Sequence, residues 1–172
     1  VNHFWSPSLQ QKLIFAMRDI KIGEELLTIY GPNECTDTIR RREYLNERFS
    51  FDCNCEMCLE GNTNGGDDRM TQIQALQEDI ALQSSVGVTD TTGASLDSVT
   101  KCLALMEKQG IGGGAFTKFI YHQGYDICLA AGDREGARSY LSHELTAMRD
   151  SEGIDSPKAI EIEQVLNHFP DE

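Results

Sequence analysis

The chain has 172 residues, of which 40% are apolar and 25% charged, as in a soluble globular protein of one domain or one domain with a small appendage. Asp and Glu outnumber Lys and Arg by 28 to 15, a net charge of −13, and residues 61–172 alone carry 8 basic and 18 acidic side chains, a net of −10. Such a surface repels phosphate backbones, so we expect no direct nucleic-acid partner. It would attract basic protein tails, although a solvated surface is the simpler explanation.

No run of about 18 apolar residues is present, so we expect no membrane partner. The chain begins at Val1, without Met or a signal-peptide pattern, which suggests that the protein starts further upstream. Three of the six cysteines lie within six residues, whereas Cys35, Cys102 and Cys128 are scattered. This pattern favours metal binding and reduced thiols over a disulfide framework, and therefore the nucleus and/or the cytoplasm.

The first sixty residues contain two strand-like segments and one helix. Residues 12–18 alternate weakly, and residues 25–30 end in β-branched and aromatic types, so both are predicted as strands, with Gly23 in the turn between them. Thr36 or Asp37 can then cap a helix that runs to about Phe49.

Beyond a polar, glycine-rich segment, Gly61 to Asp68, the apolar period changes from two to about 3.6. Five helices are predicted, separated by a Ser/Thr/Gly-rich loop at 84–94 and by glycines at 110, 112–114 and 132. Asp133 is expected to cap the fourth helix, and Ser156 the fifth, with Pro157 at its first position. The apolar stripes are Met70, Ile73, Leu76, Ile80; Leu96, Val99, Leu103, Met106; Phe116, Phe119, Ile120, Ile127; Ala137, Leu141, Leu145, Met148; and Ile160, Ile162, Val165, Leu166.

The pair of predicted helices at 115–131 and 133–149 is similar to a tetratricopeptide helix-turn-helix unit, although no strict 34-residue repeat is present. The stripes by themselves indicate only a helical core.

The cysteine cluster is the most informative feature. Cys53, Cys55 and Cys58 bring three thiolate donors into one short segment, as zinc sites require. The alternative is three incidental cysteines, some of them buried as small apolar residues. A structural zinc site needs a fourth ligand, which would be Cys35, His3 or a residue outside this chain.

Four motifs, in their order and spacing, resemble the C-terminal half of a SET domain with its post-SET zinc segment. They are Asn2-His3, the segment 19–30 (DIKIGEELLTIY), Arg41-Arg42, and the segment 51–58 (FDCNCEMC). The helical remainder is similar to the C-terminal helices of the SMYD-type branch. The later motifs, Gly132-Asp133 followed by Ala137 and the segment 155–157, are less specific.

The resemblance implies an S-adenosylmethionine-dependent protein-lysine methyltransferase. Asn2 and His3 match the pair that contacts the methyl donor, and Phe51 matches the aromatic residue that packs on the donor's adenine. Tyr30 matches the catalytic tyrosine that lines the lysine channel. Without the resemblance, Tyr30 would be an ordinary strand-end tyrosine, Phe51 a core residue, Asn2 a turn residue, and His3 a histidine with satisfied hydrogen bonds or a zinc ligand.

The implied fold class is α+β, mostly α. Residues 1–50 would be the C-terminal part of a SET domain, 51–60 the post-SET zinc-binding segment, 61–69 a linker, and 70–172 a helical, tetratricopeptide-like domain. The cofactors would be zinc and, in the parent protein, S-adenosylmethionine; the partner would be a protein substrate with a lysine, such as a histone tail. Because the donor-binding N-terminal half is absent, the strands would have unpaired edges, and we expect the chain alone to be inactive.

One departure from the family pattern concerns the zinc site. Many members have a cysteine, their fourth zinc ligand, where this chain has Trp5, and an indole cannot ligate zinc. Trp5 therefore favours a second hypothesis, a degenerate, non-catalytic SET protein that binds other proteins through its helical domain. A zinc-finger nucleic-acid binder is disfavoured by the charge and by the lack of a second ligand pair.

Overall fold

The computed structural model describes residues 1–28, 37–61, 63–86 and 92–169. These residues form two strands and seven helices, so the protein is α+β and mostly α, as predicted. The elements are β1 (Asn2–Ser6), β2 (Gln11–Phe15), α1 (Thr38–Phe49), α2 (Glu56–Glu60), α3 (Gly66–Val86), α4 (Thr92–Lys108), α5 (Gly114–Ala130), α6 (Arg134–Glu152) and α7 (Pro157–Asn167). Among the described residues, no helix is long and apolar enough to cross a membrane.

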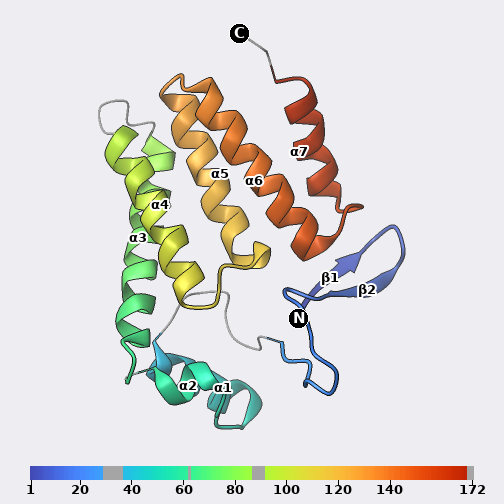
Figure 1. Cartoon of the computed structure of the whole chain (residues 1–172), viewed down its shortest axis with the longest axis vertical. Helices are drawn as coiled ribbons and strands as arrows, with labels where there is room; N and C mark the ends of the chain where they lie inside the picture. Colours follow the sequence, from blue (N-terminus) through green and yellow to red (C-terminus); the bar gives the residue numbers. More distant parts are fainter. Residues whose placement is uncertain (29–36, 62, 87–91, 170–172) are drawn as a thin grey trace.

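Helices α3 to α7 form the body of the molecule, while α1, α2 and the two strands lie at one end of it (Figure 1). The predicted stripes supply the core. Ile73, Ile80, Val99 and Met106 are fully buried between α3, α4 and α5, and a second cluster joins α6 to α7 through Leu141, Leu145, Met148, Ala159 and Ile162. The helical part therefore has its own apolar interior, made of two clusters.

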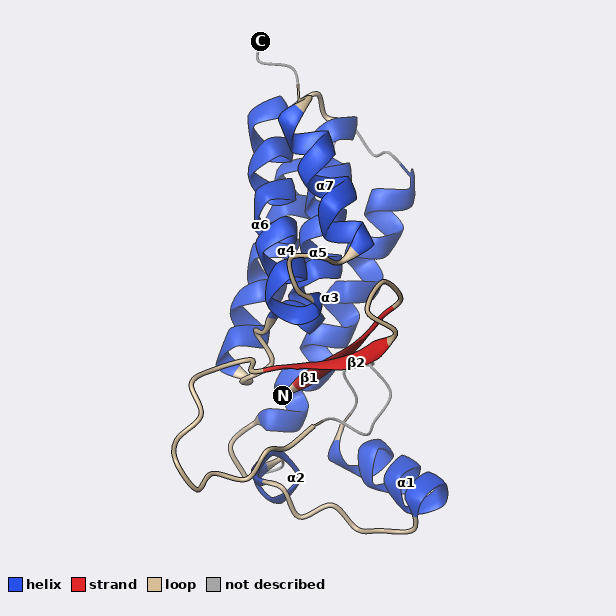
Figure 2. Cartoon of the chain, turned by 90° about the vertical axis from the view of Figure 1, so that its right-hand side faces the viewer, coloured by secondary structure: helices blue, strands red, loops and turns tan. Residues whose placement is uncertain are grey.

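The strands form one antiparallel hairpin, in which Asn2 pairs with Phe15 and Ser6 with Gln11. It packs against the C-terminal end of α6, beside the start of α7 (Figures 1 and 2). Successive side chains of a strand point to opposite faces. Phe4 and Phe15 are accordingly half-buried, whereas Trp5 and Ile14 on the other face are 58% and 66% exposed.

The strand predictions were only partly correct. The strand expected at 12–18 is β2, which ends at Phe15, and its partner β1 was not predicted. The strand expected at 25–30 is wrong for residues 25–28, where Leu26 and Leu27 are 60% and 61% exposed; residues 29 and 30 lie outside the described part. A strand needs a neighbour to satisfy its backbone groups, and residues 25–28 have no ladder partner among the described residues. The turn at Gly23 is confirmed, with a φ of +83°.

The helix predictions agree better with the structure. Asp37 caps α1 by accepting from the backbone N–H of Arg40 at 2.9 Å, and Asp133 caps α6 by accepting from that of Gly136 at 2.9 Å. Ser156 precedes α7 as expected, but its hydroxyl donates to Glu152 at 2.8 Å instead of capping the helix. The predicted glycine-rich segment ends early, because α3 begins at Gly66. Of the loop expected at 84–94, residues 84–86 are in α3 and 92–94 in α4, and the rest lies outside the described residues.

Helices α5 and α6 pack unusually closely because glycine replaces a side chain at their contact. A Cβ on Gly114, the first residue of α5, would lie 2.1 Å from the carbonyl oxygen of Ala147. A Cβ on Gly124 would lie 2.7 Å from the ring of Tyr140. Glycines 112–114 were predicted as a separator between two helices; Gly114 is instead the first residue of α5 and permits the approach of α6. A tetratricopeptide-type repeat stays a prediction.

We expect Gly114→Ala to destabilise the chain by about 1–3 kcal/mol, because the new methyl group meets backbone that cannot move aside cheaply. The matched control is Gly93→Ala in α4, where a Cβ meets nothing within 4 Å and alanine stabilises a helix by up to about 1 kcal/mol. Chemical denaturation monitored by circular dichroism measures both. Equal stabilisation by the two substitutions would contradict the close packing.

Candidate metal centre

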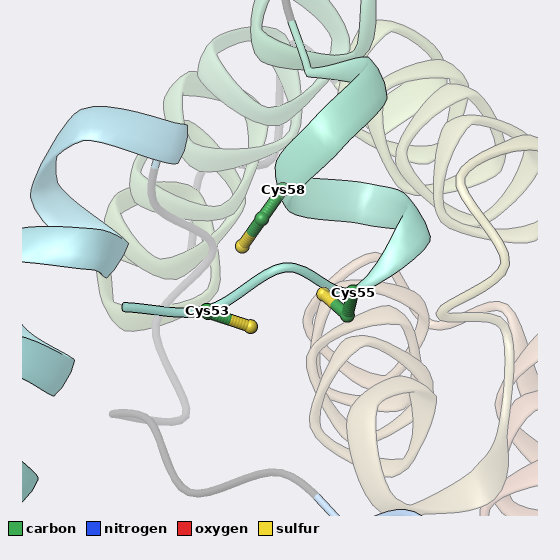
Figure 3. Close-up of side chains that lie close together, drawn as sticks. All are labelled: Cys53, Cys55 and Cys58. Carbon is green, nitrogen blue, oxygen red and sulfur yellow. The ribbon is translucent and has the colours of Figure 1, made fainter. Parts of the chain in front are cut away.

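The three clustered cysteines converge in space. Cys53 lies in the segment after α1, Cys55 is the residue before α2, and Cys58 is inside α2. Their sulfur atoms all lie within 4.8 Å of one another, and Figure 3 shows the three side chains directed into the same space. The structure therefore brings together the three residues that the sequence analysis singled out.

Local backbone geometry explains the convergence. Cys55 is extended, with φ −64° and ψ 160°, and alternate residues of an extended segment, such as Cys53 and Cys55, lie on the same side of it. The carbonyl of Cys55 then accepts from the backbone N–H groups of Cys58 and Leu59, at 2.9 and 3.0 Å, which starts a helical turn. Three residues apart on that turn, Cys55 and Cys58 are neighbours. An extended pair followed by a helical turn thus gathers three sulfurs within six residues.

The environment of the cluster differs from one sulfur to the next. Burial raises the pKa of the Cys53 thiol to about 11. Burial acts in the same direction on Cys58, which is only 3% exposed, but the hydrogen bonds from Arg41 and Cys53 outweigh it and hold the pKa of Cys58 below its ordinary value. The Arg41 Nε–H donates to the Cys58 sulfur at 3.3 Å, and Arg42 Nη2 donates to the Cys58 carbonyl at 3.1 Å. Sequence reasoning missed this function of the two arginines.

The donor set fits zinc. Zinc binds thiolate sulfur at about 2.3 Å in a tetrahedron, so that bound sulfurs lie about 3.8 Å apart. Sulfurs already within 4.8 Å need only a small contraction to reach that spacing. Within the part of the chain that is described, no other Cys, His, Asp or Glu joins the three. His3 lies on β1, and Cys35 lies outside the described residues.

The residues implied to bind the methyl donor are not assembled into one pocket in the described part of the chain. The Asn2 side chain donates to the backbone oxygen of Ser151 at 2.9 Å, and His3 is exposed on the face of the hairpin that also carries Trp5. Phe51 is 40% exposed, two residues before the cluster, and Tyr30 lies outside the described residues. Their roles in binding S-adenosylmethionine and in catalysis stay a prediction.

Two cavities lie elsewhere, and neither contains a predicted site residue. One, of about 330 Å³, runs along α1 and is lined by Arg42, Glu43, Asn46, Glu47 and Asp52. The other, of about 270 Å³, lies over α6 between α5 and α7. Its floor includes Glu144, Met148 and Glu152, whose spacing of four places them along one side of α6. That spacing is the one sequence signal that could have suggested this cavity.

Four of the charged groups that line the cavity between α5 and α7 form two pairs across α5 and α6. The Glu144 carboxylate, 4% exposed, bonds to His122 Nδ1 at 2.9 Å, and Glu152 pairs with Lys118 and accepts from Ser156. The hydrogen bond from His122 to the Glu144 carboxylate raises the pKa of His122, and burial lowers it. The negative charges of Glu144 and Asp126 raise this pKa further, whereas the positive charge of Lys158 lowers it. These internal pairs hold α5, α6 and α7 together.

The chain is similar, at low sequence identity, to a protein of known name. It is 26% identical over 176 aligned positions to "Histone-lysine N-methyltransferase set5" of Schizosaccharomyces pombe. The alignment covers 98% of this chain and 52% of the relative, so the chain spans about half the length of the curated relative that it matches. No protein-family model matches the chain. The similarity extends over both the cysteine cluster and the helical part.

We expect the pair of His122 and Glu144 to make stability depend on pH. Because the pKa of folded His122 is raised above the unfolded value of 6.5, its contribution is fully present below pH 6.5 and is lost as pH rises through the higher folded value. His122→Gln should therefore flatten the decline in stability above pH 6.5, measured by thermal unfolding at several pH values. His143→Gln, at an exposed histidine of α6, is the control and should leave the decline unchanged. An unaltered profile in His122→Gln would contradict this assignment.

Proposed function

We propose that this chain is the C-terminal half of a SET-type protein-lysine methyltransferase. The observation that carries the proposal is similarity along 98% of the chain to a protein named as a histone-lysine N-methyltransferase, at about half of that protein's length. The convergence of the three cysteine sulfurs supports it independently. In this proposal, residues 1–50 end the SET domain, 51–60 are the post-SET segment, 61–69 a linker, and 70–172 an SMYD-like helical domain.

The zinc centre has a structural function in this proposal. Cys53, Cys55 and Cys58 supply three ligands, and the fourth comes from Cys35, from His3 after a rearrangement of the hairpin, or from the remainder of the parent protein. Trp5 supplies none, since an indole does not ligate zinc. A closed four-ligand site stabilises a small segment that has little core of its own.

The reaction of the parent would be methyl transfer from S-adenosylmethionine to the side-chain nitrogen of a protein lysine. The amine must first lose a proton, because its reference pKa is about 10.4 and the protonated form has no lone pair. A narrow apolar channel favours the neutral form, and a tyrosine hydroxyl such as that of Tyr30 would orient it. Asn2, His3 and Phe51 would contact the donor once the other half of the enzyme completes the pocket.

A histone tail is the substrate to test first, because it agrees with the name of the relative and because a chain with a net charge of −13 attracts basic tails. A nuclear and/or cytoplasmic location follows from that substrate class. The competing function is a non-catalytic scaffold that binds proteins through α3 to α7, which the exposed Trp5 favours.

The zinc centre predicts one equivalent of zinc per chain in protein purified without a chelator. The zinc is measured by elemental analysis and by a chromogenic dye that binds the zinc released when the thiols are blocked. Cys55→Ser should lose most of that zinc, because it leaves two thiolate ligands and a hydroxyl that binds zinc only weakly. Cys128→Ala changes a buried cysteine of α5 outside the cluster and should keep the full equivalent. If the wild-type protein contained no zinc, the proposed zinc centre would be wrong.

The catalytic proposal predicts no methyl transfer by the 172-residue chain and measurable transfer by the full-length parent, in an assay with radiolabelled S-adenosylmethionine and histone tails. Tyr30→Phe in the parent should lower the rate by at least tenfold while donor binding, measured calorimetrically, persists. A parent that binds no donor would instead support the scaffold. Turnover by the isolated chain would refute the division of the active site between two halves.

A further inference from the structure

The sulfur of Cys58 is connected to the helical body by consecutive hydrogen bonds. Arg41 on α1 donates through Nε to the Cys58 sulfur at 3.3 Å and through Nη2 to the Thr38 hydroxyl at 3.2 Å. The Thr38 hydroxyl in turn donates to Asp67 Oδ1 at 2.7 Å. Asp67 is the second residue of α3, so these bonds run from the cysteine cluster through α1 to the first long helix of the body.

Asp67 also satisfies a group that α1 cannot satisfy itself. The first backbone N–H groups of a helix have no partner within the helix. The Thr38 N–H, at the first position of α1, donates to the same Asp67 oxygen at 2.9 Å. One carboxylate of α3 thus holds both the backbone and the side chain of Thr38, which is only 6% exposed.

The three helices meet at Gly61, which follows α2. The Asp67 N–H donates to the Gly61 carbonyl at 2.9 Å. A Cβ on Gly61 would lie 2.0 Å from the Thr38 hydroxyl oxygen and 2.9 Å from Asp67 Oδ1. The contact between Thr38 and Asp67 is therefore enclosed by the end of α2, the helix that carries Cys58. A shift of α2 would displace the first residues of α3.

We propose that Arg41, Thr38 and Asp67 are positioning residues that couple metal binding at the cysteine cluster to the junction of α1, α2 and α3. The inference rests on the zinc centre of the proposed function. A sulfur bound to zinc carries negative charge, which strengthens its hydrogen bond from the Arg41 guanidinium. Arg41 is then held more firmly against Thr38, and Thr38 against Asp67. Since linkage is reciprocal, loosening the Thr38–Asp67 end weakens zinc binding.

The test compares zinc affinities of the 172-residue chain by competition with a chelating dye. Removing a hydrogen-bond partner of a metal ligand typically weakens binding 10–100-fold, and we expect this for Arg41→Gln. Thr38→Val removes the hydroxyl at nearly constant shape and should weaken zinc binding several-fold. Thr38→Ser retains the hydroxyl and should bind zinc with the affinity of the wild type. Arg48→Gln, at an exposed arginine in the last turn of α1, is the matched control for lost charge.

A second measurement separates coupling from a general loss of folding. Zinc should slow amide hydrogen exchange at Thr38 and Asp67 in the wild type and in Thr38→Ser, and should do so much less in Thr38→Val. Equal zinc affinity in Thr38→Val and wild type, or no effect of zinc on exchange at these amides, overturns the coupling while the zinc centre stands. A wild-type chain that binds no zinc overturns both.

Discussion

The Asp67 carboxylate is the contact on which the arrangement of the two parts of the chain depends. It accepts from the backbone and the hydroxyl of Thr38, 29 residues earlier, at 2.9 and 2.7 Å. The helical body has its own apolar interior and does not need α1 for its core. The small elements around the cysteines have little apolar interior, with Leu45 and Cys58 as their buried apolar side chains among the described residues. Their attachment to the body combines the apolar contact of Met57 with the body's core and the polar contact of Thr38 with Asp67. The polar contact is strengthened because the Thr38 side chain is largely removed from water.

The helices were predictable because their signals are local. Each signal lies within or beside a single helix: an apolar residue every three or four positions, an Asp before the first turn, and a Gly after the last. Asp37, Asp133 and Gly132 are such signals in this chain. The strands were predictable only in part, because a strand is defined by its neighbour. β1 and β2 pair through a four-residue connection without Gly at the positive-φ position, Gln10, so the usual hairpin signal is missing. Leu26 and Leu27 have strand-like composition, but no partner among the described residues.

The candidate metal centre likewise has one part that local sequence predicts and another part that it does not. Cys53, Cys55 and Cys58 are close in sequence, so their convergence follows from an extended pair and one helical turn. Arg41 is 17 residues from Cys58, and its role depends on how α1 packs against α2, which no local pattern encodes. The sequence points to the Arg41-Arg42 pair only as part of the family resemblance. The structure instead directs both guanidinium groups at Cys58, one to its sulfur and one to its carbonyl.

Charge explains why these arginines matter in a chain that is otherwise strongly acidic. Zinc bound by three thiolates and a neutral histidine has a net charge of −1, and zinc bound by four thiolates has −2. Residues 1–60 contain 7 basic and 10 acidic side chains, and the body beyond them is more acidic still, so the surroundings disfavour a further anion. A guanidinium 3.3 Å from the buried sulfur offsets part of this charge where it is least solvated. A site with an additional cysteine would depend on Arg41 more strongly than a site completed by histidine, so the sensitivity of zinc affinity to Arg41 reports on the chemical class of the fourth ligand.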